Sequence, residues 1–163
     1  MRITLVLIAL MLTSCIIKSV DIMPNQVGVI RSNGGLLQPG NHLIPFYEEF
    51  AIYEISEQSL TQEIQILTKD LKPASTEFLL RYFPQRSAID SLDNMFGEKY
   101  VERMVIPELR AGVRRIFQGI SADSLNKVDK KKIELLVRED LTTILRSNHV
   151  IVSEIELKQL KLP

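Results

Sequence analysis

The residue best placed to do chemistry in this sequence is its one cysteine, Cys15. The three residues before it are Leu12, Thr13 and Ser14, a large apolar residue followed by two small ones. Small side chains beside a peptide bond let a peptidase reach that bond, and the thiol beyond it can act as the nucleophile that takes up a diacylglycerol group. This spacing predicts cleavage before Cys15 and lipidation of its sulfur.

The segment in front of this motif has the order of a secretory signal. Met1-Arg2 gives a positive start, and residues 3–11 that follow are almost entirely apolar. A helix needs about 20 apolar residues to cross a bilayer, and the charge of Lys18 interrupts this run before that length is reached. Together with residues 12–15, the segment is similar to the signal peptide and lipobox of bacterial lipoproteins.

We therefore expect residues 1–14 to be a lipoprotein signal peptide, residues 15–24 a lipidated N-terminal tether, and residues 25–163 a folded domain. Two or three acyl chains on Cys15 would anchor the domain firmly, because each buried methylene contributes about 0.8 kcal/mol. The expected location is the bacterial cell envelope, facing the periplasm or the exterior. The alternative is that Cys15 is an ordinary apolar residue of an uncleaved signal anchor.

Composition and motifs argue against several other functions. Twenty Lys and Arg balance twenty Asp and Glu, so no bulk positive charge would attract nucleic acid. His42 and His149 are far apart in the sequence, without a metal-ligand motif around either. Ser, His and Asp are present, but without a nucleophile elbow or a plausible His-carboxylate pair a hydrolase is only a minor alternative. We predict no metal, no cofactor and no enzymatic activity.

The first part of the expected domain has the pattern of strands and turns. Short runs of alternating apolar and polar residues are separated by turns that contain Gly34-Gly35 and Pro39-Gly40. The runs that predict strands are residues 26–31, 42–46, 50–55, 64–66 and 78–83. The last two are expected to pair in one antiparallel sheet.

The second part changes to the period of a helix. A short helix is expected over residues 87–96 and a second from Pro107, while Ser121 is expected to cap the next turn. The clearest helix runs from Lys130 to Arg146, and its apolar stripe consists of Ile133, Leu136, Val137, Leu141, Ile144 and Leu145. A last strand is predicted from the alternation of Ile151, Ser153, Ile155 and Leu157. The order of elements predicts an α+β fold, an antiparallel sheet with helices packed on it.

These pieces, read in order, resemble the SPFH or Band 7 domain of the prohibitin and stomatin family over nearly the whole length after Cys15. No single fragment is decisive, but their order and spacing are specific. The residues that carry the resemblance are Asn25-Gln26-Val27-Gly28-Val29, Leu37-Gln38-Pro39-Gly40-Asn41-His42-Leu43-Ile44-Pro45-Phe46, Gln58-Ser59, Ile66-Leu67-Thr68-Lys69-Asp70, Leu80-Arg81-Tyr82, Phe96-Gly97-Glu98-Lys99-Tyr100-Val101-Glu102-Arg103 and Ile106-Pro107-Glu108-Leu109-Arg110-Ala111-Gly112-Val113-Arg114.

The resemblance implies a membrane-anchored scaffold or interaction module with no catalysis of its own, modulating membrane organisation or envelope protein quality control. Its expected partners are membrane lipid through acylated Cys15 and protein partners: the chain itself, a longer family member or a membrane protease. Relatives continue past the Leu-Pro that matches Leu162-Pro163 into a long coiled coil, which this sequence lacks, so ring assembly is not implied. The alternative function is a lipid- or small-ligand-binding envelope lipoprotein that uses the face of its sheet.

Overall fold

The computed structural model describes residues 17–125 and 127–161, and the chain divides into two compact units at Glu54 and Ile55. Cys15 and the expected signal peptide lie outside the described residues. The domain expected over residues 25–163 contains most of one unit and the whole of the other. We call the unit up to Glu54 the N-terminal unit and the unit from Ile55 the C-terminal unit.

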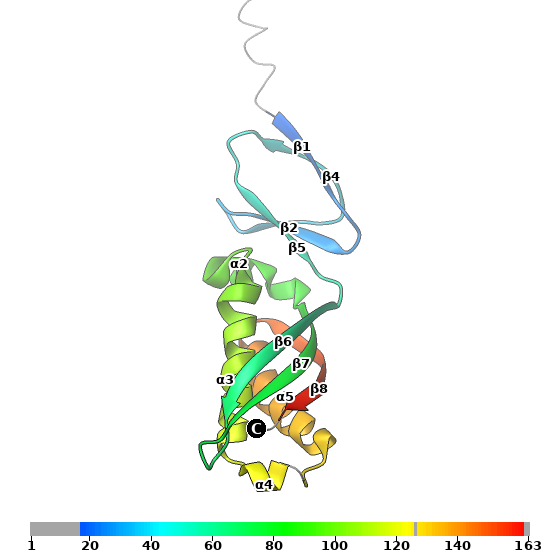
Figure 1. The fold of residues 1–163 in the computed structure, drawn as a ribbon. Coiled ribbons are helices and arrows are strands. Elements are labelled where there is room, and N and C mark those ends of the chain that lie inside the picture. The colour runs from blue at the N-terminus through cyan, green and yellow to red at the C-terminus, as the bar shows by residue number, and fades with distance from the viewer. Residues whose placement is uncertain (1–16, 126, 162–163) are drawn as a thin grey trace, which may run out of the picture. The chain divides into compact units, whose positions relative to one another are not determined.

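The N-terminal unit consists of two small antiparallel sheets. In the first sheet, β1 (Ile17–Ile22) pairs with β4 (Gly40–Pro45). In the second, β2 (Gln26–Ile30) lies between β3 (Gly35–Leu37) and β5 (Phe50–Glu54) (Figure 1). The side chains that form its core come from both sheets: Val20, Ile22, Leu37 and Ile44, with Ile30 and Phe50 packed against them.

Three of these strands, β2, β4 and β5, lie close to where the alternation of residues predicts strands, whereas β3 and β1 differ from the expectation. Residues 17–22 lie within the range expected to be a tether, yet they pair residue by residue with β4, from Ile17 opposite Pro45 to Ile22 opposite Gly40. The reason is that β1 is amphipathic, because Val20 and Ile22 are buried in the core and the residue between them is exposed. The folded part therefore includes residues before position 25.

The C-terminal unit is a three-stranded antiparallel sheet with helices packed on it, which confirms the predicted α+β fold. Its strands are β6 (Gln58–Leu67), β7 (Pro73–Pro84) and β8 (Val150–Lys161), with β7 in the centre. After β7 come a 3₁₀ turn (Arg86–Ala88), α2 (Ile89–Phe96) and a π-helical segment (Val101–Val105). The helices α3 (Ile106–Gln118), α4 (Ala122–Leu125) and α5 (Lys130–Ser147) follow, and α3 contacts β6 while α5 contacts β8.

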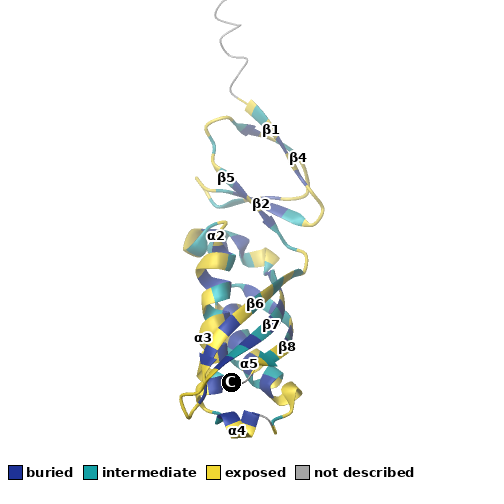
Figure 2. Ribbon diagram, in the orientation of Figure 1, coloured by how far each residue is buried: buried dark blue, intermediate teal, exposed yellow. Residues whose placement is uncertain are grey.

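The core of the C-terminal unit lies between the inner face of the sheet and the two long helices. On the central strand, Phe78, Leu80 and Tyr82 alternate inward and are almost completely buried (Figure 2). On α5 the buried residues are Ile133, Val137, Leu141 and Leu145, spaced four apart. Leu136 and Ile144, predicted as part of this stripe, are only half-buried because they lie at its margin. The buried stripe is narrower than the sequence pattern predicts.

The last strand contains an irregularity that the sequence pattern does not reveal. Tyr82 lies opposite Val152 and Arg81 lies opposite Glu154, so Ser153 is an extra residue in β8. This is a β-bulge, which reverses the alternation of the bulged strand. Val150 and Val152 are therefore buried before the bulge, and Ile155 and Leu157 after it. The prediction of one uninterrupted alternation from Ile151 to Leu157 is wrong for this reason.

Polar side chains from the helices bond to the backbone of both outer strands of this sheet. On β6, the carbonyl of Gln65 accepts from Arg114 of α3, with 3.3 Å between oxygen and nitrogen. On β8, the N–H of Leu157 donates to Glu134 of α5 over 2.8 Å, and the carbonyl of Ser153 accepts from Arg138 of the same helix over 3.3 Å. The helices are therefore joined to the edges of the sheet as well as to its inner face.

The buried stripe of α5 gives a direct test of the core. Leu141 is fully buried, whereas Leu135 on the same helix is 54% exposed. Replacing Leu141 with Ala should lower the free energy of unfolding by about 2–5 kcal/mol, because it leaves a cavity that the surroundings only partly fill. The matched control Leu135→Ala should change it by less than about 0.5 kcal/mol. Denaturant unfolding followed by circular dichroism measures both, and equal effects would contradict this assignment of the core.

Candidate functional site

The outer face of the β1–β4 pair carries apolar side chains that the fold does not bury. Ile17, Leu43, Phe46 and Tyr47 are 66%, 72%, 70% and 77% exposed, and we call them the apolar patch. Ile17 and Leu43 lie on one face of the ribbon formed by β1 and β4. Leu43 pairs with Ser19, which is two residues from Ile17 in the same strand and therefore points to the same face. The opposite face of the same ribbon holds Val20, Ile22 and Ile44 in the core. Both faces of the ribbon are therefore partly apolar, and one of them faces outward.

The two aromatic residues of the patch occupy a turn that is tied down by its neighbours. The N–H of Glu48 donates to the carbonyl of Pro45 over 3.0 Å, so Phe46 and Tyr47 are the central residues of a β-turn. The ammonium group of Lys18 donates to the carbonyl of Glu48 over 2.7 Å and lies 4.9 Å from the centre of the Phe50 ring. Central turn positions usually hold small or polar residues. Here the turn instead exposes two aromatic rings, while Lys18 is turned toward Glu48 and Phe50.

A second feature is a network of hydrogen bonds that fixes the β6–β7 hairpin to the start of α4. One carboxylate oxygen of Asp70 accepts from the hydroxyl of Thr68 over 2.6 Å and from the N–H of Ala122 over 3.0 Å. The N–H of Lys69 donates to the carbonyl of Ile120 over 2.9 Å. The bonds that Asp70 accepts, from the hydroxyl of Thr68 first and from the N–H of Ala122 next, lower its pKa from the ordinary 3.8 to about 2.

The side chain that caps α4 belongs to this network and is not the one that the sequence predicts. Ser121 is the predicted cap of the turn after Gly119, but its hydroxyl contacts the hydroxyl of Ser124 at 2.8 Å. The N–H of Ala122, one of the donors at the start of α4 that lack a partner within the helix, is satisfied by Asp70 from the hairpin instead. The cap therefore comes from a residue 52 positions away in the sequence, which local spacing cannot reveal.

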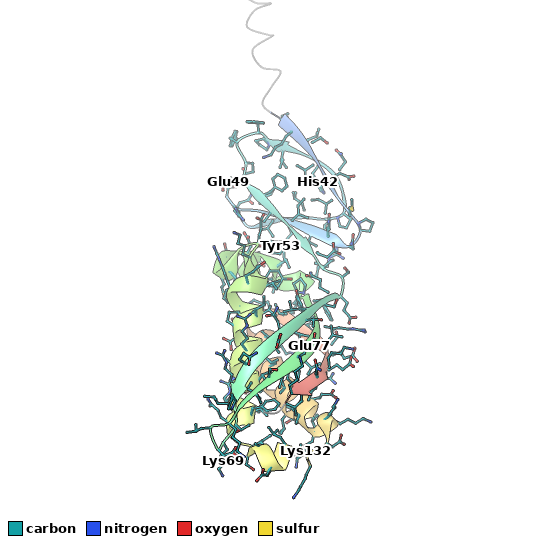
Figure 3. The ribbon with its side chains drawn as sticks, in the orientation of Figure 1. His42, Glu49, Tyr53, Lys69, Glu77 and Lys132 are labelled. Carbon is teal, nitrogen blue, oxygen red and sulfur yellow. The ribbon has the colours of Figure 1, made fainter. Side chains whose placement is uncertain are left out.

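Lysines gather around this junction. Lys69 and Lys72 lie in the hairpin loop, and the sequence from 127 to 132, which connects α4 to α5 and begins α5, is Lys-Val-Asp-Lys-Lys-Lys. Figure 3 shows Lys69 and Lys132 at the end of the C-terminal unit where the hairpin and α4 lie. We call Lys69, Lys72, Lys127, Lys130, Lys131 and Lys132 the lysine-rich end. The run at 130–132 is visible in the sequence, but nothing there connects it with the hairpin.

The other polar clusters in the described residues have structural explanations. The phenol of Tyr82 donates to Gln58 over 3.3 Å, and Gln58 donates to the phenol of Tyr100 over 3.4 Å. Burial raises the pKa of both phenols, so both tyrosines are neutral at neutral pH. The Nε2 atom of His42 lies 2.6 Å from the carbonyl of Gln38, and His149 belongs to the other unit, between α5 and β8. Within residues 17–125 and 127–161, no three His, Cys, Asp or Glu side chains are grouped to hold a metal.

A depression marks the outer side of the sheet in the C-terminal unit. It measures about 230 Å³ and is lined by Glu63, Ser75, Thr76, Glu77, Gln159 and Lys161. Glu63 and Glu77 lie directly opposite each other across β6 and β7, which brings two carboxylates together. A lining of this charge does not suit an acyl chain.

Comparison with known proteins identifies a family over most of the chain. The family model described as SPFH domain / Band 7 family matches residues 20–163. None of the curated proteins compared with the chain matches it. Among the described residues, no helix has the length and apolar character needed to cross a membrane.

The hydrogen bonds of Asp70 predict a dependence of stability on pH. Because its pKa is about 2 in the folded protein and about 3.8 when unpaired, ionised Asp70 stabilises the fold above pH 4, and this contribution is lost as the pH falls toward 2. Asp70→Asn should therefore melt at a lower temperature than the wild type at pH 6. The two proteins should converge near pH 2. A difference in melting temperature that stays constant from pH 6 to pH 2 would contradict this role.

Proposed function

The chain belongs to the SPFH domain / Band 7 family, and from that membership we propose that it is a membrane-anchored scaffold or interaction module of the prohibitin and stomatin type. In this proposal the protein performs no catalysis. Its function is to hold a folded domain, and the proteins that the domain contacts, at a membrane of the bacterial cell envelope.

The observation that carries the proposal is the apolar patch of the N-terminal unit. Exposed aromatic rings suit the interface between the lipid headgroups and the acyl chains, because their apolar part enters the lipid while polar groups stay in water. Phe46 and Tyr47 are exposed in a turn that the bond from Glu48 to Pro45 closes. A soluble monomer gains nothing from exposing these rings, whereas a protein resting on a membrane buries them.

The predicted lipid on Cys15 fits the same orientation. Ile17, the first residue of β1 and a member of the patch, comes two positions after Cys15. An extended chain spans about 3.3–3.6 Å per residue, so the anchor could lie no more than about 7 Å along the chain from Ile17. A lipid on Cys15 would bring the patch to the membrane surface, and the patch would add a second, weaker attachment.

We propose that such a scaffold binds a second copy of the chain, a longer member of the family or a membrane protease. The alternative function, a lipid- or small-ligand-binding lipoprotein that uses the sheet, has less support. The depression on the sheet is small and is lined by Glu63, Glu77 and Lys161 among other polar residues, which favours water over an acyl chain.

Lipidation of Cys15 is tested by replacing its thiol. In the native host, Cys15→Ser should remain an unlipidated precursor and should lose the membrane fractionation that survives a high-salt wash, because the acyl chains have no attachment atom. Mass spectrometry of the purified protein and fractionation of the cells measure the two effects. The matched control Ser14→Ala keeps a small residue before Cys15 and should behave as wild type. Salt-resistant membrane fractionation of Cys15→Ser would refute the lipid anchor.

The contribution of the patch is tested separately in the unlipidated Cys15→Ser protein. Phe46→Ser combined with Tyr47→Ser should weaken co-sedimentation with phosphatidylcholine vesicles about tenfold or more, because each ring loses up to about 1.5–3 kcal/mol of burial in the lipid. The control pair Met95→Ser and Leu135→Ser removes exposed apolar side chains from the C-terminal unit and should leave binding unchanged. Equal losses in the two pairs would remove the patch from the proposal.

A further inference from the structure

The lysine-rich end carries positive charge that the described structure does not neutralise. All six lysines of this end are exposed. Lys72 contacts Asp70 at 3.5 Å, but across residues 17–125 and 127–161 no ion pair involves Lys127, Lys130, Lys131 or Lys132. The charge is therefore available to another molecule.

Three of the carboxylates near these lysines bond to backbone N–H groups, whereas Asp123 of α4 is exposed. Asp70 accepts from Ala122, Asp129 accepts from Lys131 over 3.1 Å, and Glu134 accepts from Leu157 over 2.8 Å. Each of these bonds holds one carboxylate oxygen in place, and Asp70 also contacts Lys72 through its other oxygen. The local acidic groups thus fix the hairpin, α4 and α5 in place, and the lysines project around them.

Three of the lysines occupy the least favourable positions of their helix. Lys130, Lys131 and Lys132 form the first turn of α5, and this turn contains no acidic residue. The N-terminal end of a helix carries a partial positive charge, so cations there are disfavoured, and three adjacent cations also repel one another. Folding alone would favour Asp or Glu at these positions, so their charge is better explained by something that binds to it.

We propose that the lysine-rich end docks an acidic, Glu- and Asp-rich segment of a partner protein. The inference concerns the C-terminal unit alone and goes beyond the proposed function, because it does not depend on membrane attachment. Carboxylates of the segment would contact the lysines at the start of α5 and in the hairpin. The network around Asp70 fixes the hairpin against the start of α4, and a group of lysines held in place before binding loses less entropy when it binds.

The apolar residues at this end favour a protein over a lipid surface. The exposed apolar side chains of the hairpin are Leu67 and Leu71, without an aromatic residue beside them. Aromatic residues are typical of membrane interfaces, and in this chain they mark the apolar patch of the other unit. Leu71 is 77% exposed and its φ is +60°, a conformation that is costly for a leucine. A projecting leucine between Lys69 and Lys72 suits a small apolar socket in a protein that also bears carboxylates.

Charge reversal at the start of α5 tests this proposal. The full chain in detergent is titrated with a fluorescein-labelled oligoglutamate peptide, and binding is followed by fluorescence anisotropy. Lys130→Glu, Lys131→Glu and Lys132→Glu together should weaken binding about tenfold or more. The same variant should melt about 2–4 °C higher than wild type, because glutamates complement the start of the helix. A matched control, Lys99→Glu, Arg146→Glu and Lys158→Glu, removes the same charge elsewhere and should keep most of the affinity.

Several outcomes would overturn the proposal. One is that the peptide does not bind saturably to the wild type, or that the control variant loses as much affinity as the test variant. Another is that the wild type binds vesicles containing phosphatidylglycerol better than phosphatidylcholine vesicles, and that charge reversal removes this difference in binding. That result would assign the lysines to a membrane. Self-association that disappears in the charge-reversed variant would assign them to a second copy of the chain.

Discussion

Burial of the inner face of the β6–β7–β8 sheet is the constraint on which the C-terminal unit depends. The central strand β7 pairs on both sides, and Phe78 and Leu80 on its inner face are fully buried. Helices α3 and α5 cover this face. The buried residues of α5 are spaced four apart, which is the spacing that keeps one side of a helix against a sheet. The hairpin, α4 and the lysine-rich end are attached to this layer.

Much of this fold could be predicted from the sequence because it follows from local periodicity. The stripe of α5 and the alternation of residues 78–83 in β7 are repeated over enough residues to fix both the type and the inward face of each element, whereas only residues 64–66 of β6 are predicted. The bulge at Ser153 could not be predicted, since it depends on which residue of β7 lies opposite each residue of β8. The cap of α4 could not be predicted for the same reason, because Asp70 comes from a distant part of the chain.

The candidate surfaces are less visible in the sequence than the fold. Cys15 is recognisable from its neighbours, and it lies outside the described residues. Phe46 and Tyr47 are residue types common in a core, and only the folded structure shows that their turn leaves them exposed. The run Lys130-Lys131-Lys132 can be read directly, but its association with Lys69 depends on the hydrogen bonds between the hairpin and α4. Contacts between distant segments, rather than residue types, define these surfaces.

Side chains of the helices bond to three backbone groups of the outer strands in the C-terminal sheet. An exposed strand edge can template the addition of a further strand, both in recognition of extended peptides and in aggregation. Here Arg114 bonds to the backbone of β6, and Glu134 and Arg138 bond to that of β8. A ligand peptide that lengthened the sheet would have to displace these side chains first. At these positions the helices thus take up backbone groups that would otherwise be open to another strand.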